Sequence, residues 1–207
     1  MGLDSYLNRM PRYKGATARD VSKVEHYMDW LKAKASGSEH AQCTFKEWCG
    51  YDKAPSTDYL NFYSDYYHVY YSEWDTEKKH PWTTIMEQVG YWRKANQIHN
   101  WLVENIQDGV DDCNYHREVT EEDLLELLDI CKKVLDSCEL IIDENGKHVK
   151  DSSIAEELLP ATPGFFFGSY EYDEWYVEDI TNTIDIINKV LETTDFETQM
   201  LYYCSSW

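Results

Sequence analysis

The sequence predicts an α+β fold, in which a small, mainly antiparallel sheet that includes both chain termini packs with about four to five helices. Three observations lead to this prediction. Strand patterns lie at both ends of the chain, over residues 1–10 and 200–204. Residues that can cap a helix precede apolar residues at helical spacing in several places. Strands and helices mix without strict alternation, which favours an α+β fold over a series of βαβ units.

Helices are predicted where a capping residue is followed by apolar residues three or four positions apart. Capping boxes, in which Thr precedes Asp or Glu by three residues, begin at Thr17, Thr44 and Thr120. Asp173 is a further N-cap residue. The ranges expected to be helical are 18–35, 44–50, 95–107, 120–138, 153–159 and 173–191.

Strands are predicted from β-rich or alternating segments that end at turn residues. The ranges expected to be extended are 1–10, 83–93, 114–119, 165–167 and 200–204. A turn is expected over residues 143–147. The aromatic run 59–74 has no clean period, and we interpret it as a loop plus a short helix.

The 207 residues are expected to form a single domain, with segment 36–80 as an aromatic-rich insertion or lid. The formal net charge is −20, from 39 acidic against 19 basic residues. This charge fits a solvated surface, and it also fits a surface that imitates nucleic acid and occupies a basic groove on a partner. Direct nucleic-acid binding through a broad surface requires an excess of Lys and Arg, and is therefore not expected.

Signals for targeting, cofactors and catalysis are absent from the sequence. No apolar run is long enough to cross a bilayer and the first residues do not form a signal peptide, so a cytoplasmic protein is expected. The six cysteines form no C-x-x-C pair, which indicates reduced thiols. The histidines form no H-E-x-x-H motif, so no metal site is predicted. Without a glycine-rich phosphate loop or a nucleophile elbow, no cofactor is predicted and binding is favoured over catalysis.

The stretch 89–101 gathers the side chains best suited to bind a ligand. Trp92 and Arg93 end a predicted strand, and Asn96 and His99 lie three apart on the helix that follows. Arg93, Asn96 and His99 could converge at this junction, where free helix amides favour an anion, with Trp92 or Trp101 as a stacking surface. Such a set suits a nucleotide or another phosphorylated ligand. The alternative is that Trp92 belongs to the core, Arg93 pairs with an acid and His99 is a satisfied histidine at the core edge.

A second candidate group lies farther along the chain. Glu171, Tyr172 and Asp173 lie between a predicted strand and a predicted helix, where binding residues are frequent. Glu171 or Asp173 could act as a base, or could orient His99 or Arg93. The alternative is that Asp173 is only a helix cap and that the tyrosine packs with its polar tip outward.

Four motifs carry a resemblance to a known group of proteins. They are MGLD with YL at residues 1–7, GYWRKANQIH at 90–99, GFFFGSYEYDEWY at 164–176 and SSW at 205–207. With these motifs the chain resembles small proteins of unknown function from phage and prophage genomes, although segment 36–80 carries none of them. The resemblance implies a phage origin, and it favours a protein that counters host defence or redirects host machinery. It implies no catalytic residue.

The leading hypothesis is a phage accessory protein that inhibits a bacterial defence system by binding. Its acidic, aromatic-rich surface would occupy the basic nucleic-acid-binding groove of a host defence protein, as anti-CRISPR proteins do. A second hypothesis is a sponge for a signalling nucleotide, or a small enzyme acting on one, with its site around Arg93, Asn96 and His99. A third hypothesis is an oligomeric structural protein whose aromatic side chains form the interface.

Overall fold

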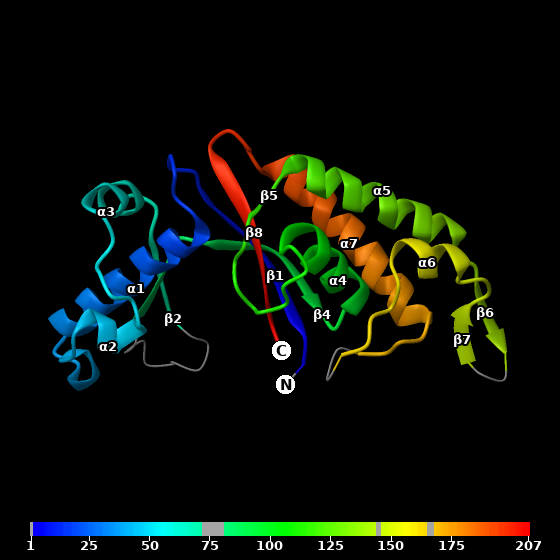
Figure 1. Cartoon of the computed structure of the whole chain (residues 1–207), viewed down its shortest axis with the longest axis horizontal. Helices are drawn as coiled ribbons and strands as arrows, with labels where there is room; N and C mark the ends of the chain where they lie inside the picture. The colour runs from blue at the N-terminus through cyan, green and yellow to red at the C-terminus, as the bar shows by residue number, and fades with distance from the viewer. Residues whose placement is uncertain (1, 72–80, 144–145, 165–167) are drawn as a thin grey trace. The chain divides into compact units, whose positions relative to one another are not determined.

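The computed structural model describes residues 2–71, 81–143, 146–164 and 168–207. These residues fall into two compact units. Unit 1 comprises the residues up to Arg9 together with Gln88–Trp207, and unit 2 comprises Met10–Glu87. Segment 36–80 lies within unit 2. The predicted α+β class is confirmed, with four long helices and three helices of seven residues or fewer in the described ranges (Figure 1).

Unit 1 contains a four-stranded, mainly antiparallel sheet in the order β4-β1-β8-β5 (Figure 1). Its strands are β1 (Asp4–Pro11), β4 (Glu87–Arg93), β5 (Glu118–Val119) and β8 (Gln199–Ser206). The first and last strands of the chain are neighbours at the centre, as predicted for a sheet that includes both termini. The sheet is therefore complete only when the final residues of the chain are in place.

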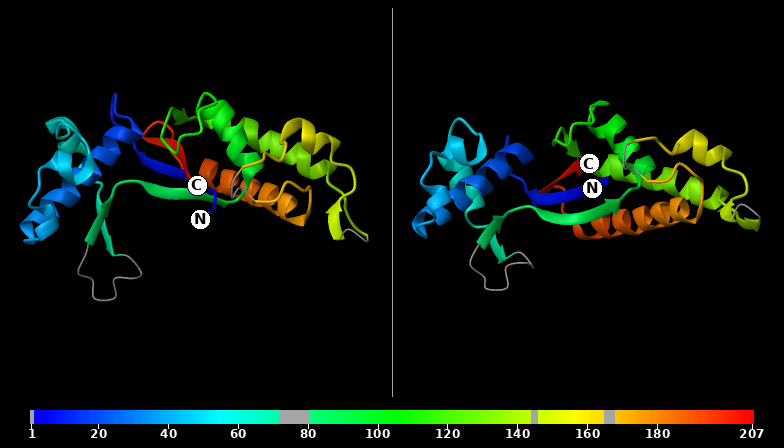
Figure 2. Two further views of the ribbon diagram at one scale, coloured as in Figure 1. Left: turned by 60° about the horizontal axis from the view of Figure 1, so that its bottom comes forward. Right: turned by 90° about the horizontal axis from the view of Figure 1, so that it is seen from below.

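Four helices pack with this sheet. They are α4 (Asn96–Ile106), α5 (Glu121–Ser137), α6 (Ser153–Leu158) and α7 (Glu174–Thr193). The long helices α5 and α7 lie side by side (Figure 1, Figure 2). Thr120 and Asp173 accept hydrogen bonds from the first backbone amides of these two helices, as the capping patterns predict. Ile98, Leu127 and Ile180 join α4, α5 and α7 in one buried apolar core.

Two short segments of unit 1 differ from the prediction. The strand expected over 114–119 is reduced to β5, because the Asn114 amide donates to Asp112 Oδ1 (3.0 Å) in a local turn. The expected turn at 143–147 belongs to a hairpin whose two strands were not predicted, β6 (Leu140–Asp143) and β7 (Gly146–Val149). The expected strand 165–167 lies outside the described residues.

Unit 2 combines helices with a second two-stranded sheet. Its elements are α1 (Ala18–Ala35), the 3₁₀-helix η1 (Glu39–Ala41), α2 (Phe45–Cys49), α3 (Thr57–Tyr63), β2 (His68–Tyr71) and β3 (Pro81–Thr84). The capping boxes at Thr17 and Thr44 are both formed, so α1 and α2 begin where predicted. The short helix expected within 59–74 is present as α3, but strand β2 was not predicted, because its antiparallel partner β3 comes later in the chain. Residues 72–74 lie outside the described ranges.

The described helices and cysteines add two findings. Over the residues that the structure places, no helix is both long enough and apolar enough to cross a membrane. All six cysteines lie within the described residues, and none of them forms a disulfide. Cys131 is fully buried in the core on α5, where burial raises the pKa of its thiol to about 12.

Gly90 on β4 lies close against α7, and its replacement by alanine is expected to destabilise unit 1. A Cβ at this position would lie 2.9 Å from Ile186 Cγ2 on α7 and 3.1 Å from Leu7 Cβ on β1. Because a packed core gives way only by shifting side chains or backbone, Gly90→Ala should cost about 1–3 kcal/mol of unfolding free energy. Urea unfolding checks this, with Gln88→Ala at an exposed position of β4 as the control. Equal stability of the Gly90→Ala and Gln88→Ala variants would contradict the packing described.

Candidate functional site

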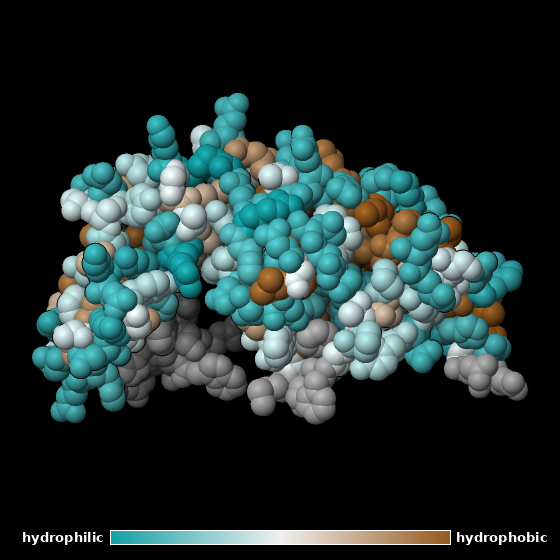
Figure 3. Space-filling model, viewed as in Figure 1, coloured by the Kyte–Doolittle hydropathy of each residue, from teal (hydrophilic) through white to brown (hydrophobic). Residues whose placement is uncertain are grey.

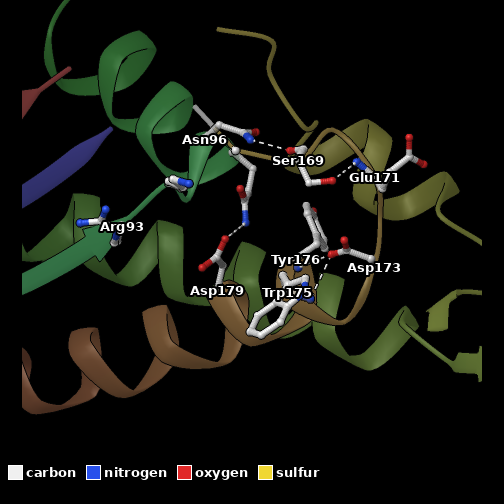
Figure 4. Close-up of a pocket in the computed structure, with 11 residues that line it drawn as sticks. Arg93, Asn96, Ser169, Glu171, Asp173, Trp175, Tyr176 and Asp179 are labelled. Carbon is white, nitrogen blue, oxygen red and sulfur yellow. Dashed lines mark hydrogen bonds between the residues drawn. The ribbon is translucent and has the colours of Figure 1, made fainter. Parts of the chain in front are cut away.

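A pocket of about 520 Å³ lies in unit 1 where β4 meets α4. Its walls come from three places in the sequence: the β4–α4 junction, residues 168–173 and the first turns of α7 (Figure 4). The lining side chains offer two cations, two amides, three carboxylates and two aromatic rings: Arg93, Lys94, Asn96, Gln97, Glu171, Asp173, Asp179, Trp175 and Tyr176. Residues more than seventy positions apart therefore meet at one cavity.

The β4–α4 junction forms one wall through an unusual backbone. Arg93 is on the exposed face of β4, with 62% of its side chain accessible, and its guanidinium lies 3.5 Å from Asp4 Oδ1. Lys94 has a positive φ of 62° and donates its backbone N–H to the Leu3 carbonyl (2.8 Å). A non-glycine residue in this region carries a strain of about 1 kcal/mol, and such strain concentrates at functional sites. Gly168 packs against this turn, where a Cβ would lie 2.9 Å from the Lys94 carbonyl oxygen.

Asn96 holds the opposite wall in place. Its side chain is nearly fully buried and bonds at both ends. Asn96 Nδ2 donates to the Ser169 carbonyl (2.9 Å), and the Thr162 N–H donates to Asn96 Oδ1 (2.7 Å). Both ends of segment 162–169 are thereby fixed to the start of α4, so Asn96 positions the pocket wall and its amide is already engaged.

The floor of the pocket is a buried amide paired with a carboxyl group. Gln97 is only 2% exposed, and its Nε2 donates to Asp179 Oδ2 at 3.3 Å (Figure 4). Burial raises the pKa of Asp179 to about 6, the nearby Glu178 and Asp173 add to the rise, and the Gln97 hydrogen bond opposes it. Asp179 therefore holds or releases a proton close to neutral pH.

The sequence analysis did not identify Asp179. It lies on α7 directly before the buried Ile180, three residues after Tyr176 and four before Thr183, both of which are buried. An acid at helical spacing within a buried stripe is the signal that could have identified it, because carboxylates are rarely placed on the core side of a helix.

The start of α7 completes the site. Asp173 Oδ1 accepts from the N–H groups of Trp175 (3.0 Å) and Tyr176 (3.1 Å), so Asp173 acts as the helix cap. Trp175 is 64% exposed and lies at the edge of the cavity, where its ring is free to stack on a planar ligand (Figure 4). Tyr176 is buried, donates its O–H to the Leu159 carbonyl (2.7 Å), and has a pKa raised by burial.

The structure brings together four of the seven residues predicted for a ligand site. Arg93, Asn96, Glu171 and Asp173 all line the pocket. Glu171 lies at the rim with its carboxylate turned away from Asp179 (Figure 4).

Trp92 and Tyr172 do not line this pocket. Trp92 is 3% exposed and donates from Nε1 to Thr183 Oγ1 (2.9 Å), so the stacking role predicted for it is corrected to a core role. Alternation along β4 explains this outcome, since Arg93 faces outward and its neighbour must face the core. The hydroxyl of Tyr172 accepts the Ala161 N–H (3.2 Å), and its ring lines a neighbouring hollow of about 590 Å³.

His99 is the main correction to the predicted site. It is 3% exposed, and it lies 2.6 Å through Nδ1 from the Tyr203 hydroxyl and 3.1 Å through Nε2 from Asp111 Oδ2. The Tyr203 hydroxyl in turn donates to Ser5 Oγ (3.0 Å). Burial lowers the pKa of His99, while Asp111 opposes that shift. The residue faces β8 because α4 is buried on several sides, so a spacing of three did not place it beside Asn96 at the cavity.

The arrangement provides binding chemistry of three kinds. Arg93 and Lys94 supply positive charge, the Gln97–Asp179 pair supplies hydrogen-bond donors and acceptors, and Trp175 supplies a ring face. Within the described parts of the chain, no group of three or more His, Cys, Asp or Glu side chains is arranged to hold a metal ion. A planar ligand with polar edges matches this lining.

Comparison with protein-family models, curated proteins and solved structures finds no match for this chain. A functional proposal therefore rests on the chemistry of the pocket and the charge of the surface.

Asp179→Asn is expected to stabilise the protein above pH 6. The pKa of Asp179 is about 6 in the folded chain and 3.8 in its ordinary state, so the folded state binds the proton more tightly. Ionisation therefore destabilises the fold progressively between about pH 4 and pH 6, and the full cost, roughly 1–3 kcal/mol, is present above pH 6. Removal of the charge should relieve this cost at pH 7 and have little effect at pH 4. Urea unfolding at several pH values measures the difference.

The matched control for this experiment is Asp185→Asn, which changes an exposed acid on the same helix. It should show no such pH-dependent gain. A gain for Asp179→Asn that is the same at pH 4 and pH 7, or no gain at either, would contradict the assignment of Asp179 as a partly desolvated carboxyl group that costs stability.

Proposed function

We propose that this protein binds a small planar ligand, a nucleoside or a nucleotide, in the pocket between β4, α4 and α7. The observation that carries the proposal is that Arg93, Asp179 and Trp175 all line one cavity. A volume of about 520 Å³ is typical of pockets that enclose small ligands. Trp175 would stack on the base, and the Gln97–Asp179 pair would form hydrogen bonds with the edge of the base. Arg93 and Lys94 would hold a phosphate or ribose oxygen.

The charge of unit 1 restricts the ligand further. This unit holds 27 of the 39 acidic residues but only 9 of the 19 basic residues, which gives it a formal net charge of −18. Each additional negative charge on a ligand is repelled by this field, which acts over about a Debye length of 8–10 Å. A nucleoside, or a cyclic nucleotide with one charge per phosphate, is therefore favoured over a nucleoside triphosphate.

The role that fits such a pocket is sequestration. The motifs that resemble phage proteins favour a ligand that a bacterial host uses as a defence signal. A protein that holds such a nucleotide without converting it lowers its free concentration, and for this role affinity and abundance matter more than turnover.

Two substitutions in the pocket should weaken binding of nucleosides and cyclic nucleotides at least about tenfold. Trp175→Ala removes the stacking surface, for which a loss of about 1–3 kcal/mol is typical. Arg93→Ala removes the exposed cation and should weaken cyclic nucleotides more than uncharged nucleosides. Isothermal titration calorimetry with both ligand classes measures these losses. Lys133→Ala, at an exposed position on α5, is the control and should bind like the unchanged protein.

Native mass spectrometry of protein purified gently from bacterial cells supplies an independent test. A retained mass of nucleotide size, lost in the Trp175→Ala variant, is the expected result. The proposal is wrong if no nucleoside or nucleotide binds in calorimetry, or if binding is unaffected by both pocket variants.

A second candidate function is inhibition of a host defence protein through the acidic surface, and the concentration of charge in unit 1 favours it. Exposed acids follow the outer faces of α5 and α7, at Glu121, Glu122, Glu126, Asp129, Glu178, Asp185 and Glu192. On the face drawn in Figure 3, hydrophilic residues cover most of unit 1, and smaller apolar areas lie over α5 and α6. A basic nucleic-acid-binding groove is the complement of such a surface.

For this second candidate, the protein should displace labelled DNA from a purified restriction enzyme or CRISPR effector, and added salt should weaken the displacement. Replacement of Glu121, Glu122 and Glu126 by Lys should abolish the effect, because it reverses the charge at one end of α5. Trp175→Ala should keep it. Displacement that survives the charge reversal, or no displacement from any effector tested, would rule out this function.

A further inference from the structure

We propose that the Gln97–Asp179 pair selects guanine, so that the ligand of the pocket is a guanine nucleoside or a cyclic guanine nucleotide. This inference rests on the proposed function, since it specifies the base that the same pocket binds. It follows from the order of hydrogen-bonding groups on the pocket floor and from the unused acceptor capacity of the Asp179 carboxyl group.

Asp179 has unused capacity to accept hydrogen bonds. Its carboxylate offers two oxygens, and Gln97 Nε2 is the one hydrogen-bond donor that reaches it among the residues that the structure describes. The contact is long, at 3.3 Å, and it engages Oδ2 alone. Asp179 is half-buried, and a partly desolvated carboxylate with so few donors gains when a ligand supplies more of them. Since Asp179 lines the cavity, a ligand that presents N–H groups there can supply these donors.

Gln97 supplies a hydrogen-bond donor next to the Asp179 carboxylate. Its Nε2 carries two hydrogens, and the one that does not point at Asp179 can donate to an acceptor on the ligand. Side by side, the pair offers a donor from Gln97 followed by two acceptors from Asp179. The complementary ligand edge is an acceptor followed by two N–H donors, which is the order of O6, N1–H and the 2-amino group on guanine.

Other bases match this floor less well. Adenine presents an acceptor at its ring nitrogen N1, and that lone pair would face the negative charge of Asp179. Hypoxanthine keeps the first two groups of guanine but lacks the 2-amino group, so one carboxylate oxygen would stay without its donor. A binding site that forms a hydrogen bond with one group of its ligand discriminates strongly against an analogue that lacks this group. The polar atoms of the site are then left without a partner.

The remaining walls suit the rest of a guanine nucleoside. Trp175, one turn before Asp179 on the same helix, presents its exposed ring at the cavity edge where a base on the floor could stack (Figure 4). Arg93 and Lys94 line the cavity from the end of β4, where the sugar and phosphate would extend. Gly168 keeps this space open, since it adds no side chain beside Lys94.

The test uses uncharged nucleosides, so that the base is examined without the phosphate. In isothermal titration calorimetry, guanosine should bind at least about tenfold more tightly than inosine and adenosine, the loss expected when a hydrogen bond to a charged group is removed. Asp179→Asn should weaken guanosine at least about tenfold and should weaken inosine less, because inosine donates N1–H but no 2-amino group to Asp179. Asp185→Asn, on the outer face of α7, should preserve the affinity and the preference. Circular dichroism and unfolding curves confirm that each variant is folded.

The outcomes separate the base preference from the pocket itself. If all three nucleosides bind equally and Trp175→Ala weakens them all, the proposed function stands and the guanine assignment is wrong. If guanosine is preferred but Asp179→Asn leaves that preference intact, the assignment to this pair is wrong. If none of the nucleosides and none of their cyclic nucleotides bind, both the assignment and the proposed function fail.

Discussion

The two hydrogen bonds of the Asn96 side chain hold together the pocket on which the functional argument depends. They fix the Thr162 amide and the Ser169 carbonyl to the first turn of α4, and so bring a segment from the second half of the chain against the end of β4. Gly168 can then lie against the strained turn at Lys94. Without this connection the cavity would lose one wall, although Arg93 and Asp179 would still be present. Asn96 thus contributes to function by positioning other residues.

The pocket also shows a conflict between stability and binding. Asp179 lies half-buried on α7 next to the buried Ile180, and its raised pKa reports the cost of partly desolvating its charge. A second cost is the left-handed backbone of Lys94. Both lie at the same cavity, next to an exposed tryptophan. Features that reduce stability and converge at one place are more readily explained by ligand binding than by folding.

Much of the fold follows from local signals in the sequence. The side chains of Thr17, Thr44, Thr120 and Asp173 each bond a backbone amide two or three residues away, so the helix starts that they cap can be predicted without the rest of the chain. Strand β2 was missed because its antiparallel partner β3 comes later in the chain. The hairpin β6–β7 was missed because the sequences of its strands alternate only weakly. The site was predicted only in part, because local spacing places some of its residues and distant contacts place the others. Arg93 and Asn96 lie beside one junction, whereas the environment of His99 is set by Tyr203, 104 residues away.

Binding at Trp175 is the central claim, and a nuclear magnetic resonance titration tests it most directly. The chain has eight tryptophans, and each indole N–H gives one signal, so the Trp175 signal can be assigned by its loss in Trp175→Phe. On addition of guanosine or cyclic guanosine monophosphate, the account predicts shifts of the Trp175 indole and of the Gln97 side-chain amide, while the Trp30 indole in unit 2 is unchanged. A Trp175 signal that does not move at saturating ligand, or shifts confined to residues outside the pocket, would contradict it.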